Sequence, residues 1–236
     1  MFSTVTLPEM NELWQETLSW QPSDEQQQQF QRLYELIIDG NKHLNLTRIT
    51  EPLEFWEKHL WDSLRGIAPL LSPNRVGVID ELPLKSMQKV IDIGTGAGFP
   101  GLPVALALPK LTVTLLDGTR KKISFLENLV PQIGIKNAVP LIGRSEEIAY
   151  QPQHRQSYDL AFLRAVASAS ICAKYSLPLL KTGGLAILYR GNWTVEEEVD
   201  LQSVVEELGG AIAQVEAFTT PLSQSVRHCV YLRKDK

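Results

Sequence analysis

The chain has 236 residues, of which 44% are hydrophobic and 21% charged, and its formal net charge is −4. This composition fits one large folded unit, or one unit with an appendage, and argues against disorder. No apolar run approaches the ~20 residues of a membrane span. Residues 1–14 lack a basic flank followed by an apolar block, so we do not expect them to act as a secretory signal. Cys172 and Cys229 have neither a disulfide framework nor a metal-ligand spacing. We therefore expect a cytoplasmic protein without a metal.

Residues 1–75 are expected to form a helical extension. Ser23 and Gln26 have the spacing of a capping box. Apolar residues at positions 30, 33, 34, 37 and 38 then form one helical stripe, which we expect to end at residues 40 and 41, Gly-Asn. A second helix should begin within residues 50–52, with Leu53 and the apolar residues at 56, 60, 61, 64 and 67 facing the core.

Polar residues lie between and on these two helices. Residues 45–48, Asn-Leu-Thr-Arg, connect the helices, and His59 and Asp62 lie three positions apart on the second one. Taken by themselves, these residues indicate a surface loop and a polar pair on a helix face. Residues 72–87 contain prolines and a glycine and predict a linker or hairpin-like connection.

From residue 76 onward we expect a second domain, in which strands and helices alternate. Strands are expected near 89–93, 111–116, 138–142, 158–164, 184–190, 212–218 and 227–233, and helices near 100–108, 120–130, 145–149, 168–179 and 194–208. Alternation predicts a mostly parallel sheet with helices on both faces. The last two strands have only a short connection, so they should be antiparallel. Seven strands with the last one antiparallel are typical of Rossmann-like class I methyltransferases, whereas nicotinamide-binding Rossmann domains typically have six parallel strands.

Residues 90–101 read VIDIGTGAGFPG, which predicts a buried strand, a tight glycine turn and a helix. Asp92 and the three alternating glycines resemble motif I of methyltransferases that use S-adenosylmethionine. Asp117 ends the second strand, about 20 residues further on, where an acid can hold a ribose diol. Gly96, Gly98 and Gly101 also fit the dinucleotide fingerprint, so a nicotinamide-dependent oxidoreductase remains an alternative, as does a structural glycine turn with a solvated aspartate.

Arg164 ends the fourth strand, at the edge of the sheet where ligands bind. It could pair with a cofactor carboxylate or an RNA phosphate through its planar fork, or form a structural ion pair with Asp92 or a neighbouring acid. The segment after this strand, LRAVAS, lacks the Pro-Pro-aromatic motif of adenine and glutamine amino-methyltransferases, and neither cysteine is expected at the site. These absences favour an acceptor that needs neither deprotonation nor covalent activation, such as N7 of guanine.

Several motifs in order carry a specific resemblance to a known family. They are NLTRIT, HLWDSL, DIGTGAGFPGLPVALALP, LLDGTRKKISFLENL, GRSEE, DLAFLRAVAS, LLKTGG and RHCVYLRK. Together they resemble the RsmG family, also called GidB, over residues 25–234. The resemblance implies methyl transfer from S-adenosylmethionine to N7 of a guanosine, guanosine 527, in 16S rRNA. It implies the small ribosomal subunit or its precursor as partner, no membrane and no metal; we favour a monomer.

The resemblance also implies roles for individual residues. The expected cofactor-binding residues are Asp92, Gly94, Gly96, Gly98, Phe99, Asp117, Gly118, Thr119, Ser145, Glu146 and Arg164. The residues expected to face RNA are Arg48, Lys181, Arg190, Arg227 and His228. No general base is predicted, because no proton leaves N7 during its methylation. A ribosome-associated binding protein without catalysis is the remaining alternative.

Overall fold

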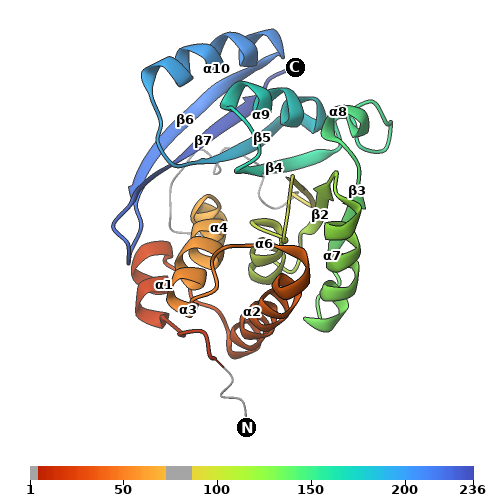
Figure 1. Ribbon diagram of the computed structural model, residues 1–236. Helices are drawn as coiled ribbons and strands as arrows, with labels where there is room; N and C mark the ends of the chain where they lie inside the picture. Colours follow the sequence, from red (N-terminus) through yellow and green to blue (C-terminus); the bar gives the residue numbers. More distant parts are fainter. Residues whose placement is uncertain (1–4, 73–86) are drawn as a thin grey trace.

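The computed structural model describes residues 5–72 and 87–236. Its centre is a seven-stranded sheet with the order β3-β2-β1-β4-β5-β7-β6 (Figure 1). The strands are β1 Lys89–Ile93, β2 Thr112–Asp117, β3 Ala138–Ile142, β4 Tyr158–Arg164, β5 Leu180–Arg190, β6 Gly210–Thr219 and β7 Val226–Lys234. Neighbouring strands from β3 to β5 in this order pair in parallel. Strand β7 pairs antiparallel with both β5 and β6. The predicted fold is confirmed, and the antiparallel β7 favours the methyltransferase sheet over six parallel strands.

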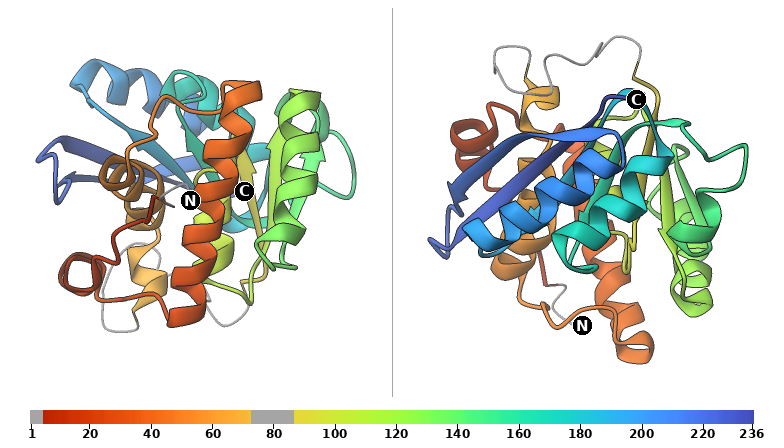
Figure 2. Two further views of the ribbon diagram at one scale, coloured as in Figure 1. Left: turned by 60° about the horizontal axis from the view of Figure 1, so that its bottom comes forward. Right: turned by 90° about the horizontal axis from the view of Figure 1, so that it is seen from above.

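Helices cover both faces of the sheet, because successive residues of each strand point to opposite faces. One face packs against α1 Asn11–Leu18, α2 Asp24–Leu44, α6 Gly101–Ala107 and α7 Arg120–Gln132, together with the helical segment that begins at Pro52. The other face packs against α8 Ser145–Ile148, α9 Ala169–Ser176, the 3₁₀ turn η3 Leu177–Leu179 and α10 Val195–Glu207. Figures 1 and 2 show the two helical layers on opposite sides of the strands. The apolar residues of the N-terminal helices share one core with the sheet.

Helix α2 begins as predicted and ends later. Ser23 and Gln26 form the capping box, and the side chains of the predicted stripe are buried or partly buried. The expected end at residues 40 and 41 is wrong: the helix continues to Leu44, and Asn45 in the left-handed region follows it. A Cβ on Gly40 would collide with the ring of Phe125 on α7. The glycine therefore permits the close approach of two helices and does not terminate one.

The second predicted helix begins at Pro52 and contains a wider turn. It runs through α3 Pro52–Phe55, the π-helical segment η1 Trp56–Trp61 and α4 Asp62–Arg65, and α5 Ala68–Leu71 follows. The predicted core positions are buried except Leu53, which is 53% exposed. A π turn inserts an extra residue per turn and so rotates the preceding face away from the 3.6-residue stripe. The same turn places His59 and Asp62 inside the protein.

The predicted linker falls mostly outside the described residues, since residues 73–86 are not among them. Within the described ranges, no helix is both long and apolar enough to cross a membrane.

Replacing Gly66 by alanine is expected to destabilise the protein. A Cβ on Gly66 would lie 2.6 Å from the hydroxyl of Tyr189, which donates a hydrogen bond to the carbonyl of Ser63, and Tyr231 donates to the Gly66 carbonyl. The two tyrosines are buried, so the added methyl overpacks the core, at a cost of about 1–3 kcal/mol. Urea unfolding measures the loss. Gly191→Ala is the control, because nothing lies within 4 Å of its Cβ position; equal losses in the two variants would contradict the overpacking.

Candidate functional site

The glycine turn, residues 94–98, follows β1 at the carboxyl edge of the sheet. Gly94, Gly96 and Gly98 have φ angles of 71°, 60° and 100°, which residues with a Cβ rarely adopt. The N–H groups of Gly94 and Thr95 donate to the carbonyl of Leu116, so the turn is fixed to the end of β2. The chain then enters α6. The predicted strand, turn and helix are confirmed.

Asp92 lies beneath the turn and is 1% exposed. Its Oδ2 accepts hydrogen bonds from Thr95 Oγ1 at 2.6 Å and from the N–H of Gly101 at 2.8 Å. Its Oδ1 is buried and finds no hydrogen-bond partner in the described part of the chain. Burial raises the pKa of this carboxyl to about 6, although the two hydrogen bonds oppose the rise. Asp92 therefore holds the turn onto the start of α6 from below.

The raised pKa of Asp92 predicts a pH dependence of stability. An aspartate in an unfolded chain has a pKa near 3.9, so the folded protein binds the proton more tightly. The stability contributed by this group is present at about pH 4, falls as the pH rises to about 6 and stays low above it. Asp92→Asn should remove this fall, about 2–3 kcal/mol, from the difference between wild type and variant. Urea unfolding from pH 4 to 8 measures it; parallel curves for the two proteins would contradict the prediction.

Asp117 closes the turn from the side. Its Oδ2 accepts from the N–H of Gly96 at 3.0 Å and its Oδ1 from the N–H of Thr119 at 2.8 Å, and Lys122 Nζ lies 3.6 Å away. A carboxylate has about four lone-pair positions, so each oxygen keeps the capacity to accept a further hydrogen bond. Such a pair of free positions suits two neighbouring hydroxyl groups of a ribose.

A cavity of about 70 Å³ lies between the ends of β1, β2 and β3. It brings together predicted residues from three loops, namely Gly94, Asp117, Gly118, Ser145 and Glu146, and adds Arg144, Val166 and Tyr175. Ser145 is buried and donates to the carbonyl of Tyr175. A Cβ on Gly118 would lie 2.7 Å from Arg144 Nε, so the backbone of Gly118 is approached at close range here. The cavity therefore lies where the sequence predicts the cofactor-binding residues to meet.

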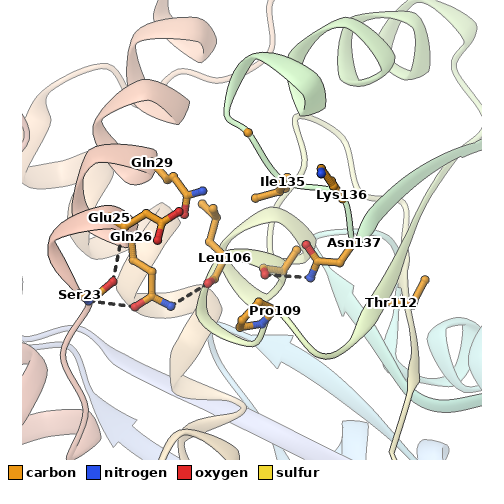
Figure 3. Close-up of a pocket in the computed structure, with 12 residues that line it drawn as sticks. Ser23, Glu25, Gln26, Gln29, Leu106, Pro109, Thr112, Ile135, Lys136 and Asn137 are labelled. Atoms are coloured by element: carbon orange, nitrogen blue, oxygen red, sulfur yellow. Dashed lines mark hydrogen bonds between the residues drawn. The ribbon is translucent and has the colours of Figure 1, made fainter.

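A larger cavity, about 580 Å³, lies at the opposite edge, where β2 and β3 begin (Figure 3). Its polar side chains already hold elements together. Gln26 donates to the carbonyl of Leu106, and Asn137 donates to the carbonyls of Ala105 and Leu111. These hydrogen bonds give the polar side chains of this cavity a structural role, and the cavity gives no reason to move the candidate site from the glycine turn.

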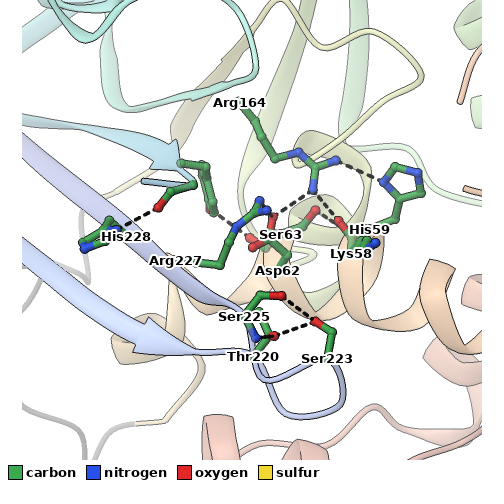
Figure 4. Close-up of polar contacts among 12 residues, drawn as sticks. Lys58, His59, Asp62, Ser63, Arg164, Thr220, Ser223, Ser225, Arg227 and His228 are labelled. Atoms are coloured by element: carbon green, nitrogen blue, oxygen red, sulfur yellow. Dashed lines mark hydrogen bonds and ion pairs between the residues drawn. The ribbon is translucent and has the colours of Figure 1, made fainter. Parts of the chain in front are cut away.

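Arg164, at the end of β4, points toward the π-helical segment (Figure 4). Its Nη1 donates to the carbonyl of Lys58 at 2.8 Å and to Asp62 Oδ2 at 3.2 Å, and its Nη2 lies 3.3 Å from His59 Nδ1. The guanidinium also lies 5.6 Å from the centre of the Phe99 ring. Among the alternatives for Arg164, the structure contains the ion pair with a neighbouring acid, and that acid is Asp62 rather than Asp92.

Asp62 and His59 were expected only as a polar pair on a helix face and were not predicted as buried residues of the site. Asp62 is 3% exposed and pairs through one oxygen with both Arg164 and Arg227. Burial lowers the pKa of His59 to about 3, and the positive charges of Arg164 and Lys58 contribute to this shift, so the imidazole is neutral. Their spacing on one helix face was visible in HLWDSL, but the arginines that face Asp62 are 102 and 165 residues away along the chain. No local pattern reports such partners.

The structure places the residues expected to face RNA in three regions. Arg190 ends β5 and His228 pairs opposite it in β7, so Arg190, Arg227 and His228 lie at the edge that carries the glycine turn. Arg190 bonds to Ala167 and Glu197, and His228 Nδ1 lies 2.8 Å from the Gly191 carbonyl. Arg48 is exposed in the loop after α2. Lys181 is not brought to this edge: it lies at the start of β5 and pairs with Asp159.

Neither metal binding nor a thiol nucleophile finds support in the geometry. No group of three or more His, Cys, Asp or Glu side chains within residues 5–72 and 87–236 could hold a metal ion. Cys172 and Cys229 are buried in α9 and β7, and burial raises the pKa of both thiols. A raised pKa keeps a thiol protonated and a poor nucleophile.

Comparison with solved structures shows similarity to methyltransferases at low sequence identity. A methyltransferase from Methanosarcina mazei, described as dependent on S-adenosylmethionine, superposes with a TM-score of 0.51 at 15% identity, over 68% of this chain and 98% of that one. M. jannaschii TYW2, solved in complex with AdoMet, has a TM-score of 0.50 at 15% identity, over 62% of this chain and 68% of that one. At these identities the likeness concerns the fold.

Comparison of sequences is more specific. Residues 26–228 match the GidB family, described as rRNA small subunit methyltransferase G. A protein of Nostoc punctiforme named ribosomal RNA small subunit methyltransferase G is 62% identical over 98% of this chain and 91% of its own length. One of Trichormus variabilis with the same name is 60% identical over the same shares. The family resemblance predicted from the motifs is confirmed, and the chain belongs to the GidB family, rRNA small subunit methyltransferase G.

Proposed function

We propose that this protein transfers a methyl group from S-adenosylmethionine to N7 of a guanosine, guanosine 527, in 16S rRNA. Membership of the GidB family supports the reaction class and the ribosomal RNA substrate. The observation that carries the proposal is the junction of the glycine turn with Asp117 at the carboxyl edge of the sheet. In open α/β sheets ligands bind outside the carboxyl ends of the strands, and this junction combines free backbone with a ribose-binding acid.

The cofactor would lie across the ends of β1, β2 and β3. Asp117 would accept hydrogen bonds from the two ribose hydroxyls, using the lone pairs that Gly96 and Thr119 leave free. The backbone around Gly118, Ser145 and Glu146 would surround the adenine. Gly94, Gly98 and Phe99 would face the methionine end, and Asp92 would keep their turn in shape from below. In this proposal residues 76–236 form the cofactor-binding domain and residues 1–75 the helical extension.

The chain's task in the reaction is to bind and orient, because N7 has a lone pair and loses no proton. S-adenosylmethionine supplies a methyl group activated by a positive sulfonium. None of the titratable groups nearest the turn is expected to act as a general base. Asp92 is buried, Asp117 accepts hydrogen bonds from backbone N–H groups, and His59 is neutral with both ring nitrogens in contact with partners. Orientation of two reactants accounts for up to ~7–11 kcal/mol in favourable cases, and a preorganised polar environment adds to it.

Arg48, Arg190, Arg227 and His228 would contact the RNA around the site. Phosphate contacts fix register and orientation without reading sequence, so these residues would present the loop that contains the target guanosine. The base must leave its stack to reach the methyl group. Lys181 remains a proposed RNA contact, although it lies at the start of β5, away from the edge of the sheet that carries the glycine turn. The partner would be the small ribosomal subunit or its precursor, in the cytoplasm.

The test is a methyl-transfer assay with labelled S-adenosylmethionine and 30S particles that lack the native methylation. Digestion and mass analysis should find the label in 7-methylguanosine. Cofactor binding without transfer would overturn the substrate and leave the cofactor. RNA binding without transfer would favour a ribosome-associated binding protein, and NADH binding in place of S-adenosylmethionine would favour an oxidoreductase.

A further inference from the structure

The loop of residues 45–48 is held rigidly against the rest of the protein. Asn41 on α2 accepts from the N–H of Thr47 at 2.9 Å and donates to the carbonyl of the same residue at 2.8 Å. This double contact fixes the backbone of Thr47. Its hydroxyl accepts from the N–H of Ile49 at 3.0 Å and lies 2.8 Å from His59 Nε2. The loop that carries Arg48 therefore has a defined contact with the π-helical segment.

The partners of His59 determine which ring nitrogen carries the proton. Arg164 has only donors, so His59 Nδ1, 3.3 Å from Arg164 Nη2, must accept. In a neutral imidazole the other nitrogen then carries the hydrogen, and Nε2 donates to the Thr47 hydroxyl. Burial and the neighbouring cations Arg164 and Lys58 lower the pKa of His59 to about 3, so the ring stays neutral. The imidazole thus continues one hydrogen-bond chain from Thr47 to Arg164.

The face of the same ring supports the glycine turn. The rings of His59 and Phe99 are stacked, with centres 4.3 Å apart and planes inclined by 10°. Phe55 packs its edge against both, at 4.9 Å from His59 and 5.6 Å from Phe99. Phe99 directly follows Gly98. A rotation of the imidazole would therefore displace the end of the turn as well as the guanidinium of Arg164.

We propose that His59 is a positioning residue that couples the loop of residues 45–48 to the cofactor turn, through a Thr47–His59–Arg164 hydrogen-bond chain and a stacked Phe99. Figure 4 shows the contact between His59 and Arg164. The inference rests on the proposed function and deepens it, because it joins the loop that carries Arg48 on the RNA side to the residues that shape the S-adenosylmethionine site. His59 acts through Phe99 and Arg164 and touches neither reactant.

A double-mutant cycle on the full chain tests the coupling, with S-adenosylmethionine affinity measured by calorimetry in the absence of RNA. Thr47→Val removes the hydroxyl and keeps the shape, and His59→Asn keeps an acceptor for Arg164 but cannot reach Thr47. One neutral hydrogen bond contributes about 1 kcal/mol, so Thr47→Val should weaken binding about fivefold. His59→Asn, which also loses the stacked ring, should weaken it by more than tenfold. Thr47→Val also removes the acceptor of the Ile49 N–H in both backgrounds, and the cycle cancels this common loss. Thr47→Val should therefore weaken binding clearly less in the His59→Asn background than in the wild type, because the hydrogen bond between residues 47 and 59 is already lost there.

Tyr34→Phe is the matched control for a purely structural role of this region. Tyr34 donates to the carbonyl of Thr50 at 2.8 Å and does not contact His59 through that hydroxyl. The Tyr34→Phe variant should lower the unfolding midpoint about as much as Thr47→Val does and should leave S-adenosylmethionine affinity unchanged. The inference is overturned if Thr47→Val weakens binding equally in the wild-type and His59→Asn backgrounds, or if it weakens binding no more than Tyr34→Phe does.

The wild-type protein separates a failure of this inference from a failure of the proposed function. Wild-type binding of S-adenosylmethionine and methyl transfer to 30S particles test the function. The cycle compares affinities and needs no RNA. Binding without transfer would refute the substrate while the cycle still reports on His59, and transfer with an additive cycle would refute the coupling alone.

Discussion

Asp117→Ala is expected to weaken S-adenosylmethionine binding at least ~100-fold and to reduce methyl transfer at subsaturating cofactor in proportion. The proposed contacts to the ribose are two hydrogen bonds to a charged acceptor, each of which contributes about 1.5–3 kcal/mol. The variant also removes the hydrogen bond that the N–H of Gly96 donates to Asp117 Oδ2 at 3.0 Å, so the turn itself loses a support. Calorimetric titration with S-adenosylmethionine measures the affinity, and labelled 30S particles report the transfer.

Asp159→Ala is the matched control, because Asp159 performs the same structural task at the other edge of the sheet. Its Oδ2 accepts from the N–H groups of Gln88 and Lys89, each at 2.9 Å. Both variants remove an aspartate that holds two backbone N–H groups, so both should lower the unfolding midpoint. Only Asp117→Ala should lose cofactor affinity. A similar affinity for the two variants would show that Asp117 does not contact the cofactor.

Asp62→Ala is expected to cause the largest loss of stability, about 3–5 kcal/mol, because it leaves a buried arginine without its counter-charge. The side chain of Arg164 is 12% exposed and Asp62 Oδ2 lies 3.2 Å from its Nη1 and 3.3 Å from Arg227 Nη2. Arg227 Nε is buried and finds no partner among the described residues, so this guanidinium depends on Asp62 even more. Urea unfolding measures the loss, and methyl transfer should fall as both arginines shift.

The pair of Arg65 and Glu216 provides the comparison for Asp62. Arg65 is as buried as Arg164, with 13% of its side chain exposed, but Glu216 is 30% exposed and the pair lies away from the glycine turn. Glu216→Ala should therefore cost about 1 kcal/mol, less than Asp62→Ala, because the carboxylate removed is already partly solvated and the Arg65 guanidinium keeps its contact with the ring of Phe218, at 4.8 Å. It should leave methyl transfer intact. If the two variants lose equal stability and equal activity, the burial of Asp62 has no special role.

The sequence allowed the sheet to be predicted because the information is local. Each strand is a short apolar run, and the connection of residues 219–225 is too short for a parallel crossover, so the antiparallel pairing of β6 and β7 follows. The glycine turn and Asp117 were predicted for the same reason, since the residues required there are glycines at positive φ and an acid at a strand end.

The polar cluster around Asp62 could not be predicted in this way. Its members come from α4 and the π-helical segment before it, the end of β4 and the start of β7, and their contact depends on the packing of the N-terminal helices on the sheet. A π turn has no clear sequence signal, so the rotation that exposes Leu53 was missed. Gly40 resembled a helix end because the approach of Phe125 is invisible in the sequence.

The place of β7 in the sheet sets an order for assembly during synthesis. β6 is made before β7, yet β7 lies between β5 and β6 and pairs with both. A nascent chain that has emerged only as far as β6 therefore has β5 as an open edge, and unpaired edges promote association between chains. Arg227 reaches Asp62 only once β7 is inserted. A partly synthesised chain thus has the glycine turn but an incomplete polar cluster, and it becomes competent only when its last strand enters the interior of the sheet.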